Sequence, residues 1–320
     1  MELFCGLDCG GTKTLCALVD ENGKIVGIGR GGPSNYLSCS EAIAQRSIAD
    51  SLKNAFINGS TEPCRIKYAY VSSAAVEVHC GKRHIPFFSS CLAADKITID
   101  NDAVPVRFSA AGRDPAIVTI SGTGSVTYAF KKEGFIKVGG WGPILGDEGS
   151  GYDIGRRAIK LATRELDGRN EEKGILEAIC NHFGIGGLHS IHRILRAGDP
   201  RSLVASAAEC VCRLYRDGNS AAARVLQDAA EEIVLSVNIA AKRAEFDKTV
   251  PLILSGSLLG PDSPLCDLVR QKLRDSRTIS CILLPRIPAA VSSAALALYN
   301  GGRKEQARKL IDGYEEKFTD

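Results

Sequence analysis

The sequence predicts an α/β protein built from two related halves, each with a mixed sheet. Both halves begin with a strand, a glycine-rich hairpin, a second strand, a glycine-containing turn and a third strand. The first hairpin lies in Leu7–Thr14 (Leu-Asp-Cys-Gly-Gly-Thr-Lys-Thr), and the second is Gly122–Ser125 (Gly-Thr-Gly-Ser). Such a repeat indicates a duplicated unit, and the alternation of strands with helices in the rest of the chain favours an α/β fold.

Three apolar runs open the first half and are expected to pair as consecutive hairpins. They are Leu3–Leu7, Leu15–Val19 and Ile25–Ile28. The helical spacing of apolar residues predicts a helix within Ser38–Asn58, with Ser40 as its N-cap and Gly59 as its stop. The elements expected next are a strand at Ile66–Val71, a helix at Phe87–Ala94, a strand at Ile97–Asp100 and a helix at Val104–Ala111.

The second half repeats the three strands and then becomes mostly helical. The predicted elements are strands at Ile117–Ser121, Val126–Phe130 and Phe135–Val138, helices at Ser150–Leu166 and Ser220–Phe246, a strand at Pro251–Ser255, a helix at Leu265–Leu273, a strand at Ile279–Leu284 and a helix at Ala289–Tyr299. We place the domains at residues 1–114 and 115–302. A charged helix within residues 303–320 is expected to pack back on the first domain.

Length and composition limit the classes of protein that the chain can form. With 320 residues, 44% of them apolar, it can form two domains with sizeable cores. The net charge of +3 gives no electrostatic reason to expect a nucleic-acid partner. The N-terminus enters a strand at once and no run approaches about 18 apolar residues, so we expect no signal peptide, no membrane span and a cytoplasmic location. These features are compatible with a homodimer.

Twelve cysteines are many for a cytoplasmic protein, and no two are spaced as Cys-x-x-Cys. Because most lie in apolar runs, they are expected to be buried, reduced thiols. Those in apolar runs are Cys5, Cys16, Cys91, Cys180, Cys210 and Cys281. A zinc site formed by Cys180, His182, His189 and His192 is an alternative, although its spacing fits no standard zinc finger.

The first hairpin has the features of an anion-binding site. Gly10 and Gly11 permit a backbone that presents consecutive N–H groups, and Thr12 and Thr14 add hydroxyl donors. The carboxylate of Asp8 would repel a phosphate unless a cation lay between them, so the arrangement implies Mg²⁺. Neither hairpin has the spacing of a P-loop or of a dinucleotide-binding loop. Two such hairpins therefore suggest one polyphosphate held between the two halves.

Further polar groups follow strand ends, where α/β proteins bind ligands. Asp102 is the candidate general base, because a hydroxyl that attacks a γ-phosphate must give its proton to a nearby carboxylate. The alternative is that Asp102 only caps the helix that follows it. Ser72-Ser73 and Ser255-Gly256 also follow strands, and a glycine at position 256 can leave flat space for an adenine ring.

Two polar loops are suited to a polyhydroxyl ligand. The loop Gly139–Tyr152 carries the single tryptophan, Trp141, together with Asp147 and Glu148, so it offers an aromatic face and two hydrogen-bond-accepting carboxylates. The alternative is that these carboxylates only cap the helix that begins at Ser150. The loop at residues 31–36 carries Asn35, whose amide both donates and accepts and so suits a sugar hydroxyl or an N-acetyl group.

Six motifs follow one another along the chain. They are Asp8–Thr14, Gly32–Asn35 (Gly-Pro-Ser-Asn), Asn101–Ala103 (Asn-Asp-Ala), Ser121–Ser125, Gly139–Gly142 (Gly-Gly-Trp-Gly) and Gly146–Ser150 (Gly-Asp-Glu-Gly-Ser). In this order they resemble the N-acetylglucosamine kinase branch of the BadF/BadG/BcrA/BcrD ATPase family, within the sugar kinase/Hsp70/actin superfamily. The resemblance covers nearly the whole chain. It implies two ribonuclease H-like domains of the actin/hexokinase type flanking an interdomain cleft.

The resemblance also implies an activity and its residues. The activity is ATP- and Mg²⁺-dependent phosphorylation of an amino sugar, foremost N-acetylglucosamine, at its 6-hydroxyl, with Asp102 as base and Asp8 at the metal. The implied sugar contacts are Asn35, Ser73, Thr123 and Asp147, to which we add Asn101, Trp141 and Glu148 as candidates from their positions. The predicted nucleotide-binding residues are Gly10, Gly11, Thr12, Lys13, Gly122, Thr123, Gly124, Ser125 and Gly256.

Two segments depart from the family pattern and keep the substrate open. Ser72–Ala75 stands where the family often has a glycine pair, and Ser292–Ala295 stands where Gly-Ala-Ala is common. Glucosamine and N-acetylmuramic acid are therefore alternative substrates. Two other classes are an iron–sulfur ATPase that activates a dehydratase or reductase and a non-catalytic, nucleotide-dependent sugar sensor. The iron–sulfur class shows its ligand cysteine in the nucleotide domain, whereas Ser121–Tyr152 contains none.

Overall fold

The computed structural model describes residues 1–36, 39–77, 81–197 and 200–314. The chain forms two compact units, one made of Met1–Gly112 together with the chain from Pro285 onward, and one made of Arg113–Leu284. The first division lies close to the predicted boundary at residues 114/115. The second division differs, because helix α10 (Ala289–Asn300), expected in the second domain, belongs to the first unit.

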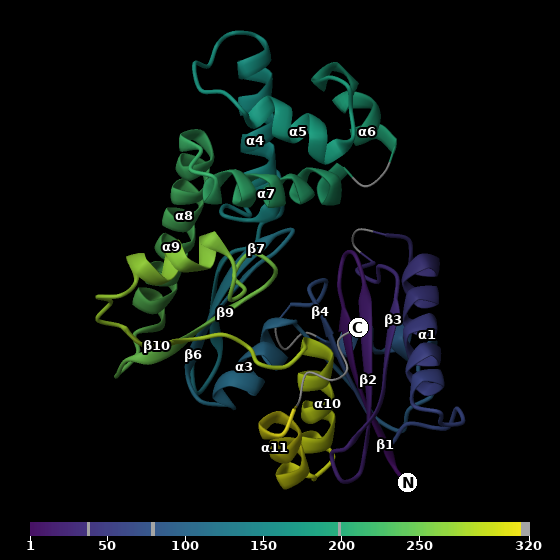
Figure 1. Cartoon of the computed structure of the whole chain (residues 1–320). Coiled ribbons are helices and arrows are strands. Elements are labelled where there is room, and N and C mark those ends of the chain that lie inside the picture. The colour runs from purple at the N-terminus through teal and green to yellow at the C-terminus, as the bar shows by residue number, and fades with distance from the viewer. Residues whose placement is uncertain (37–38, 78–80, 198–199, 315–320) are drawn as a thin grey trace. The chain divides into compact units, whose positions relative to one another are not determined.

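The sheet of the first unit has the order β3-β2-β1-β4-β5 (Figure 1). Its strands are β1 (Leu3–Cys9), β2 (Thr14–Asp20), β3 (Ile25–Gly31), β4 (Tyr68–Ser73) and β5 (Ile97–Asp100). The first three pair antiparallel as consecutive hairpins, whereas β4 and β5 run parallel to β1. The sheet is therefore mixed, as predicted.

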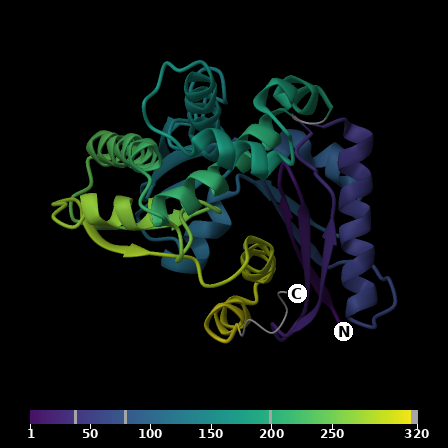
Figure 2. The same cartoon turned by 45° about the horizontal axis from the view of Figure 1, so that its top comes forward.

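Helices cover both faces of this sheet (Figure 2). Helix α1 (Glu41–Asn58) packs on β3 and β2, and its N-cap Ser40 accepts a hydrogen bond from the backbone of Ile43, as predicted. Helix α10 packs on β1 and β4, with α11 (Lys304–Asp312) beside it. A Cβ atom at Gly6 would lie 2.1 Å from the carbonyl oxygen of Ala290. The bare backbone at this glycine therefore lets α10 lie directly on β1.

The remaining helices of the first unit are short. They are η1 (Gly81–His84), α2 (Ile85–Ser89) and α3 (Ala103–Ala111). The helix predicted at Phe87–Ala94 was wrong in its bounds, because the chain leaves the helix early and Ala94 forms a parallel bridge with Ile66. The terminal helix ends at Asp312, and the rest of its predicted range lies partly outside the described residues.

The second unit repeats the same strand arrangement in the order β10-β9-β6-β7-β8. Its strands are β6 (Ala116–Ser121), β7 (Ser125–Phe130), β8 (Phe135–Gly139), β9 (Val250–Ser255) and β10 (Ile279–Leu283). Strands β6, β7 and β8 pair antiparallel, and β9 and β10 run parallel to β6. Each unit thus holds one mixed five-stranded sheet of the same topology, which confirms the predicted fold class.

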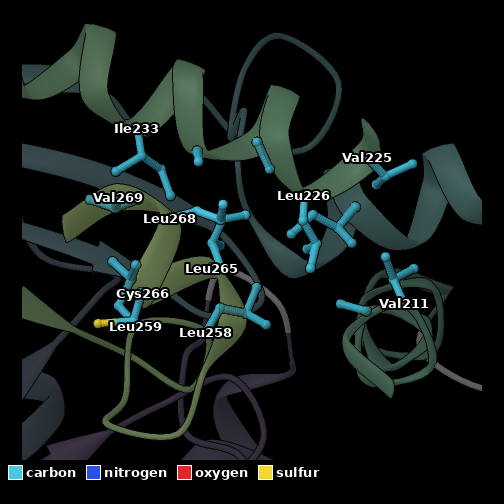
Figure 3. Packing of buried hydrophobic residues seen from close by; sticks show 14 of the residues in the cluster. Val211, Val225, Leu226, Ile233, Leu258, Leu259, Leu265, Cys266, Leu268 and Val269 are labelled. Carbon is cyan, nitrogen blue, oxygen red and sulfur yellow. The ribbon is translucent and has the colours of Figure 1, made fainter. Parts of the chain in front are cut away.

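Helices dominate the chain between β8 and β9. They are α4 (Gly151–Leu166), α5 (Ile175–Phe183), η2 (Leu188–Ser190), α6 (Ile191–Ala197), α7 (Pro200–Arg216) and α8 (Ser220–Ala244), and α9 (Pro264–Lys272) follows β9. Apolar side chains of α8 and α9 meet in the core, for example Ile233 and Leu265 (Figure 3). No helix within the described ranges is long and apolar enough to cross a membrane.

The predicted burial of the cysteines was right for some positions and wrong for others. Cys5, Cys16 and Cys210 are buried free thiols, and Cys91 and Cys180 are partly buried. Cys281 is exposed, because β10 is an edge strand of its sheet and its residues face the core only in part. Among the described residues, no group of three or more His, Cys, Asp or Glu is arranged to hold a metal ion.

Candidate active-site residues

The sheet of the first unit brings several of the predicted site residues together at the carboxyl ends of its strands. In the strand register, Asp8 at the end of β1 lies opposite Ser72 on β4, and Ser72 lies opposite Asp100 on β5. These strands run parallel, so their carboxyl ends lie side by side at the same end of the sheet. Asp102 lies two residues after the end of β5. The topology therefore gathers Asp8, the serine pair and Asp102 into one cluster.

The carboxyl groups of Asp8 and Asp102 interact electrostatically. Burial, together with the neighbouring Asp8 carboxylate, raises the pKa of Asp102 to about 7. Burial also raises the pKa of Asp8 to about 6, although Lys13 opposes this shift. Two carboxyl groups with raised pKa values at one strand edge form a site that can exchange a proton near neutral pH. The same pair offers the oxygen ligands that Mg²⁺ prefers.

Asp102 is the residue before α3, but its side chain makes no capping hydrogen bond. Asn101 bonds the start of the helix instead, because its Oδ1 accepts from the backbone N–H of Ala103 at 3.0 Å, while its Nδ2 donates to the carbonyl of Val76 at 2.7 Å. The side chain of Asp102 therefore makes no bond typical of an N-cap. The bonds of the buried Asn101 amide give it a role in holding the Asp102 segment.

The glycine hairpin of the first unit is joined to the loop that carries Asn35. The carbonyl of Gly10 accepts hydrogen bonds from the backbone N–H groups of both Ser34 and Asn35, at 3.0 and 3.1 Å. Gly11, Thr12 and Lys13 at the tip of the hairpin are exposed. The predicted phosphate loop and the predicted sugar loop thus form one connected structure.

Ser73 is fully buried, and its hydroxyl accepts a hydrogen bond from the backbone N–H of Ala75 at 3.2 Å. Its neighbour Ser72 donates to the carbonyl of Leu7 at 2.9 Å. From the other side, Ser293 on α10 is hydrogen-bonded to the Ser72 hydroxyl at 3.2 Å. The two unusual serine segments therefore meet each other beside the strand end that carries Asp8.

In the second unit, the hairpin Gly122–Ser125 is bonded along its length to the loop at residues 139–152. Ser121 Oγ donates to the carbonyl of Gly149 at 2.9 Å, and Ser125 Oγ donates to the carbonyl of Glu148 at 2.6 Å. The first N–H group of helix α4, from Gly151, donates to the carbonyl of Gly122 at 2.7 Å. These bonds place Thr123 and Gly124 next to the loop that carries Asp147.

Asp147 is buried and has a positive φ of 58°, a conformation that residues other than glycine seldom adopt. Its Oδ1 accepts from the backbone N–H of Gly142 at 3.1 Å, and its Oδ2 accepts from Arg201 Nη2 at 3.1 Å. Arg201 was missed by the sequence reasoning, because it lies on α7, far along the chain from Asp147. The capping role belongs to Ser150, whose side chain accepts from the backbone N–H of Asp153.

The other predicted residues of this loop are exposed. Glu148 is exposed, and Trp141 keeps 71% of its surface accessible, with Lys137 Nζ 5.4 Å from the centre of its ring. Ile144 and Leu145 beside it are also exposed. The loop thus presents apolar side chains outward while Asp147 stays buried.

Gly256 follows β9 with a φ of +98°, and a Cβ atom there would lie 2.2 Å from the carbonyl oxygen of Ser121. Its lack of a side chain makes room for the backbone of the neighbouring strand. Next to it lies a cavity of about 530 Å³ within the second unit. Its walls come from residues 257–264 and from one face of α7, with Glu209, Cys212, Arg213 and Arg216.

The comparisons with known proteins agree with this structure. The model of the BadF/BadG/BcrA/BcrD ATPase family matches residues 5–294. The chain is 32% identical to an N-acetylmuramic acid/N-acetylglucosamine kinase of Clostridium acetobutylicum, over 85% of this chain and 90% of that protein. It is 26% identical to an N-acetyl-D-glucosamine kinase of Dictyostelium discoideum, over 93% and 98%.

The fold also has a close match among solved structures. A protein from Chromobacterium violaceum, provisionally named an N-acetylglucosamine kinase, aligns with a TM-score of 0.75 at 23% identity, over 93% of this chain and 99% of that chain. At this identity the match supports the fold alone. The class that fold and family define is that of the kinases. The chain belongs to the BadF/BadG/BcrA/BcrD ATPase family, which confirms the resemblance seen in its motifs.

Proposed function

We propose that this protein is an ATP-dependent amino-sugar kinase that phosphorylates N-acetylglucosamine at its 6-hydroxyl. The observation that carries the proposal is the interaction between the carboxyl groups of Asp8 and Asp102 at the carboxyl ends of parallel strands. Burial and the Asp8 carboxylate together raise the pKa of Asp102 to about 7. A general base works best when its pKa lies near the working pH. The names of the relatives supply the class of substrate.

In the proposed reaction the sugar 6-oxygen forms a bond to the γ-phosphorus of ATP. The bond from that phosphorus to the bridging oxygen of the β-phosphate breaks, and ADP leaves with the electron pair. Asp102 accepts the proton of the attacking hydroxyl, which leaves a sugar phosphate. A divalent cation, when bound, would neutralise charge on the phosphates. Asp8 is the residue that would hold it, because burial beside a second carboxyl group favours a cation there.

The two glycine hairpins are proposed to bind the phosphates. Gly10–Lys13 and Gly122–Ser125 present backbone N–H groups and hydroxyls, and backbone N–H groups that converge in a turn bind anions. The N–H of Gly151 at the start of α4 is already bonded to Gly122, which favours binding by the hairpin over binding by the helix N-terminus. The cavity beside Gly256 is proposed to hold the nucleoside of ATP.

The sugar is proposed to contact Asn35, Ser73, Thr123 and Asp147, with Trp141 and Glu148 at the rim and Asn101 as a supporting residue. N-Acetylmuramic acid and glucosamine are the alternative substrates, and the name of the Clostridium relative includes the former. The cytoplasmic location and the homodimer stay predictions.

The test is an assay of ADP release with the purified full-length protein, ATP and Mg²⁺, over a panel of free sugars. The panel holds N-acetylglucosamine, N-acetylmuramic acid, glucosamine, N-acetylmannosamine and glucose. We expect release that depends on N-acetylglucosamine and a product phosphorylated at the 6-position. ADP release without any sugar would instead favour an ATPase, and sugar binding without ADP release would favour a sensor.

A further inference from the structure

One arginine in the second unit contacts both of the predicted binding loops. Arg201 Nη2 donates to Asp147 Oδ2 at 3.1 Å, and the side chains of Arg201 and Asp147 are 35% and 4% exposed. A Cβ atom at Gly124 would lie 2.7 Å from Arg201 Nη2 and 2.8 Å from Asp147 Oδ2. The guanidinium, the carboxylate and the glycine hairpin therefore meet at one point.

Arg201 reaches this point from a different part of the fold. It is the second residue of α7, whereas Asp147 lies in the loop before α4. Helices α4 and α7 pack against each other along their length. The ion pair thus fixes the loop to the helical insertion as well as to the hairpin.

The ion pair also compensates for the burial of Asp147. Burial raises the pKa of Asp147, and Arg201 opposes that shift, as does the backbone N–H of Gly142, while the nearby Glu148 adds to it. A carboxylate accepts hydrogen bonds best when it is ionised and can accept about four of them. Arg201, Gly142 and the backbone N–H of Ser125 supply three of these, which leaves capacity for one bond to a ligand.

We propose that Arg201 is a positioning residue that holds Asp147 in the orientation required to bind the sugar. This inference rests on the proposed function, since it takes Asp147 as a sugar contact. Arg201 acts through Asp147 and does not itself touch the sugar. Its guanidinium fixes Oδ2 of Asp147 beside the Gly124 hairpin. The carboxylate of Asp147 is then held in one orientation, and its remaining lone pairs are available to the sugar.

The test compares Arg201→Met, Arg201→Lys, Asp147→Asn and the double variant Arg201→Met/Asp147→Asn in the full-length protein. Loss of one partner of a buried charged pair is costly, so Arg201→Met is expected to raise the sugar KM about tenfold or more. The ATP KM should change by less than about twofold, since Asp147, through which Arg201 acts, is the proposed contact of the sugar. Arg201→Lys keeps a cation at this position and should recover part of the sugar affinity.

The double variant decides whether Arg201 acts through Asp147. If it does, Arg201→Met in the Asp147→Asn background should change the sugar KM by less than about twofold, because residues that act through one contact are not additive. The same loss in both backgrounds would overturn the inference. Thermal unfolding of each variant shows whether it is folded. If Arg201→Met does not fold, Arg201→Lys replaces it in the comparison.

A matched control is available in the same unit. Arg157 pairs with the buried Asp153 at 3.0 Å, and their side chains are 28% and 6% exposed. Arg156 contacts the same carboxylate at 3.0 Å, so Arg157→Met removes one of two arginines from a buried carboxylate. It should lower stability but leave the sugar KM within about twofold. Equal effects of Arg157→Met and Arg201→Met on the sugar KM would show a general structural effect and overturn the inference. A wild-type protein that neither binds nor phosphorylates any amino sugar would overturn the proposed function as well.

Discussion

The hydroxyl of Thr14 lies 2.6 Å from the hydroxyl of Ser34 and 2.7 Å from the carbonyl oxygen of Gly32. Thr14 and Ser34 are completely buried. Thr14 begins β2 directly after the glycine hairpin, whereas Ser34 precedes Asn35. One pair of hydroxyls therefore joins the proposed nucleotide loop to the proposed sugar loop.

Thr14→Val keeps the side-chain shape but removes this hydrogen bond. We expect it to reduce the unfolding free energy by about 1–3 kcal/mol, because Ser34 and Gly32 would lose a buried partner. It should also raise the KM for both substrates several-fold, because the two loops would no longer be fixed to each other. Denaturant unfolding and steady-state kinetics measure the two effects.

Thr119→Val is the matched control, because the Thr119 hydroxyl lies 2.9 Å from that of Thr127 between two strands of the other sheet and both are buried. It should cost a similar free energy of unfolding and leave both KM values unchanged. Thr14→Val with unchanged KM values would show that the loops are positioned by backbone contacts alone.

Asp102→Asn should lower kcat by roughly two or more orders of magnitude, which is the contribution expected of a general base. Both KM values should change little, because the amide has the shape of the carboxyl group. Single-turnover and steady-state assays at saturating substrates measure this effect. A variant with the kcat of the wild type would remove Asp102 from the chemistry.

The raised pKa of Asp102 also predicts a pH dependence of stability in the absence of metal. Its folded value of about 7 lies above the ordinary value of 3.8, so the folded state binds a proton that the unfolded state releases at neutral pH. The resulting stability is present below the ordinary pKa and is lost as the pH rises through about 7. Unfolding in the presence of a chelator should therefore become harder as the pH falls from about 8 to about 5.

Asp102→Asn should remove the part of this dependence that comes from Asp102 and leave the smaller part that comes from Asp8, whose pKa is raised to about 6. At about pH 8 the variant should be more stable than the wild type by on the order of 2–4 kcal/mol, and the difference should shrink toward acidic pH. Equal stability of the two proteins at about pH 8 would contradict the raised pKa.

Asp147→Ala should raise the sugar KM far more than the ATP KM. The reason is that the proposed sugar contact would be lost, while the backbone N–H groups of the Gly122–Ser125 hairpin would remain. Substrate titrations with each partner at saturation separate the two constants. The opposite pattern would place the sugar elsewhere.

Trp141 gives a direct signal of sugar binding, because it is the single tryptophan of the chain and is 71% exposed. If the sugar stacks on its indole ring, the emission should shift to shorter wavelength as water leaves the ring. Titration of the sugar without ATP measures the shift. Unchanged emission at a saturating sugar concentration, in a protein that is active, would remove Trp141 from the sugar site.

The sequence could predict those features that depend on neighbouring residues. Ser40 was identified as an N-cap because a capping side chain bonds to the backbone within three residues of itself. The two hairpins followed from their glycines, and the strand-end cluster of Asp8 and Asp102 followed from the rule that parallel strands end at a common edge.

The features that the sequence could not predict depend on contacts between distant residues. Arg201 meets Asp147 only because α7 packs along α4, and no local pattern marks that contact. The place of α10 depends on Gly6, near the other end of the chain. The contact of Gly256 with the backbone of Ser121 was not predicted for the same reason.

The seat of α10 on β1 has a consequence for synthesis on the ribosome. The chain of the second unit is continuous from Arg113 to Leu284, so it can become compact while translation proceeds. The sheet of the first unit instead keeps one face uncovered until α10 (Ala289–Asn300) has emerged from the ribosome. Nascent chains of this protein should thus need chaperones chiefly for the segment that is synthesised first. This is the reverse of the usual order, in which the amino-terminal domain folds first.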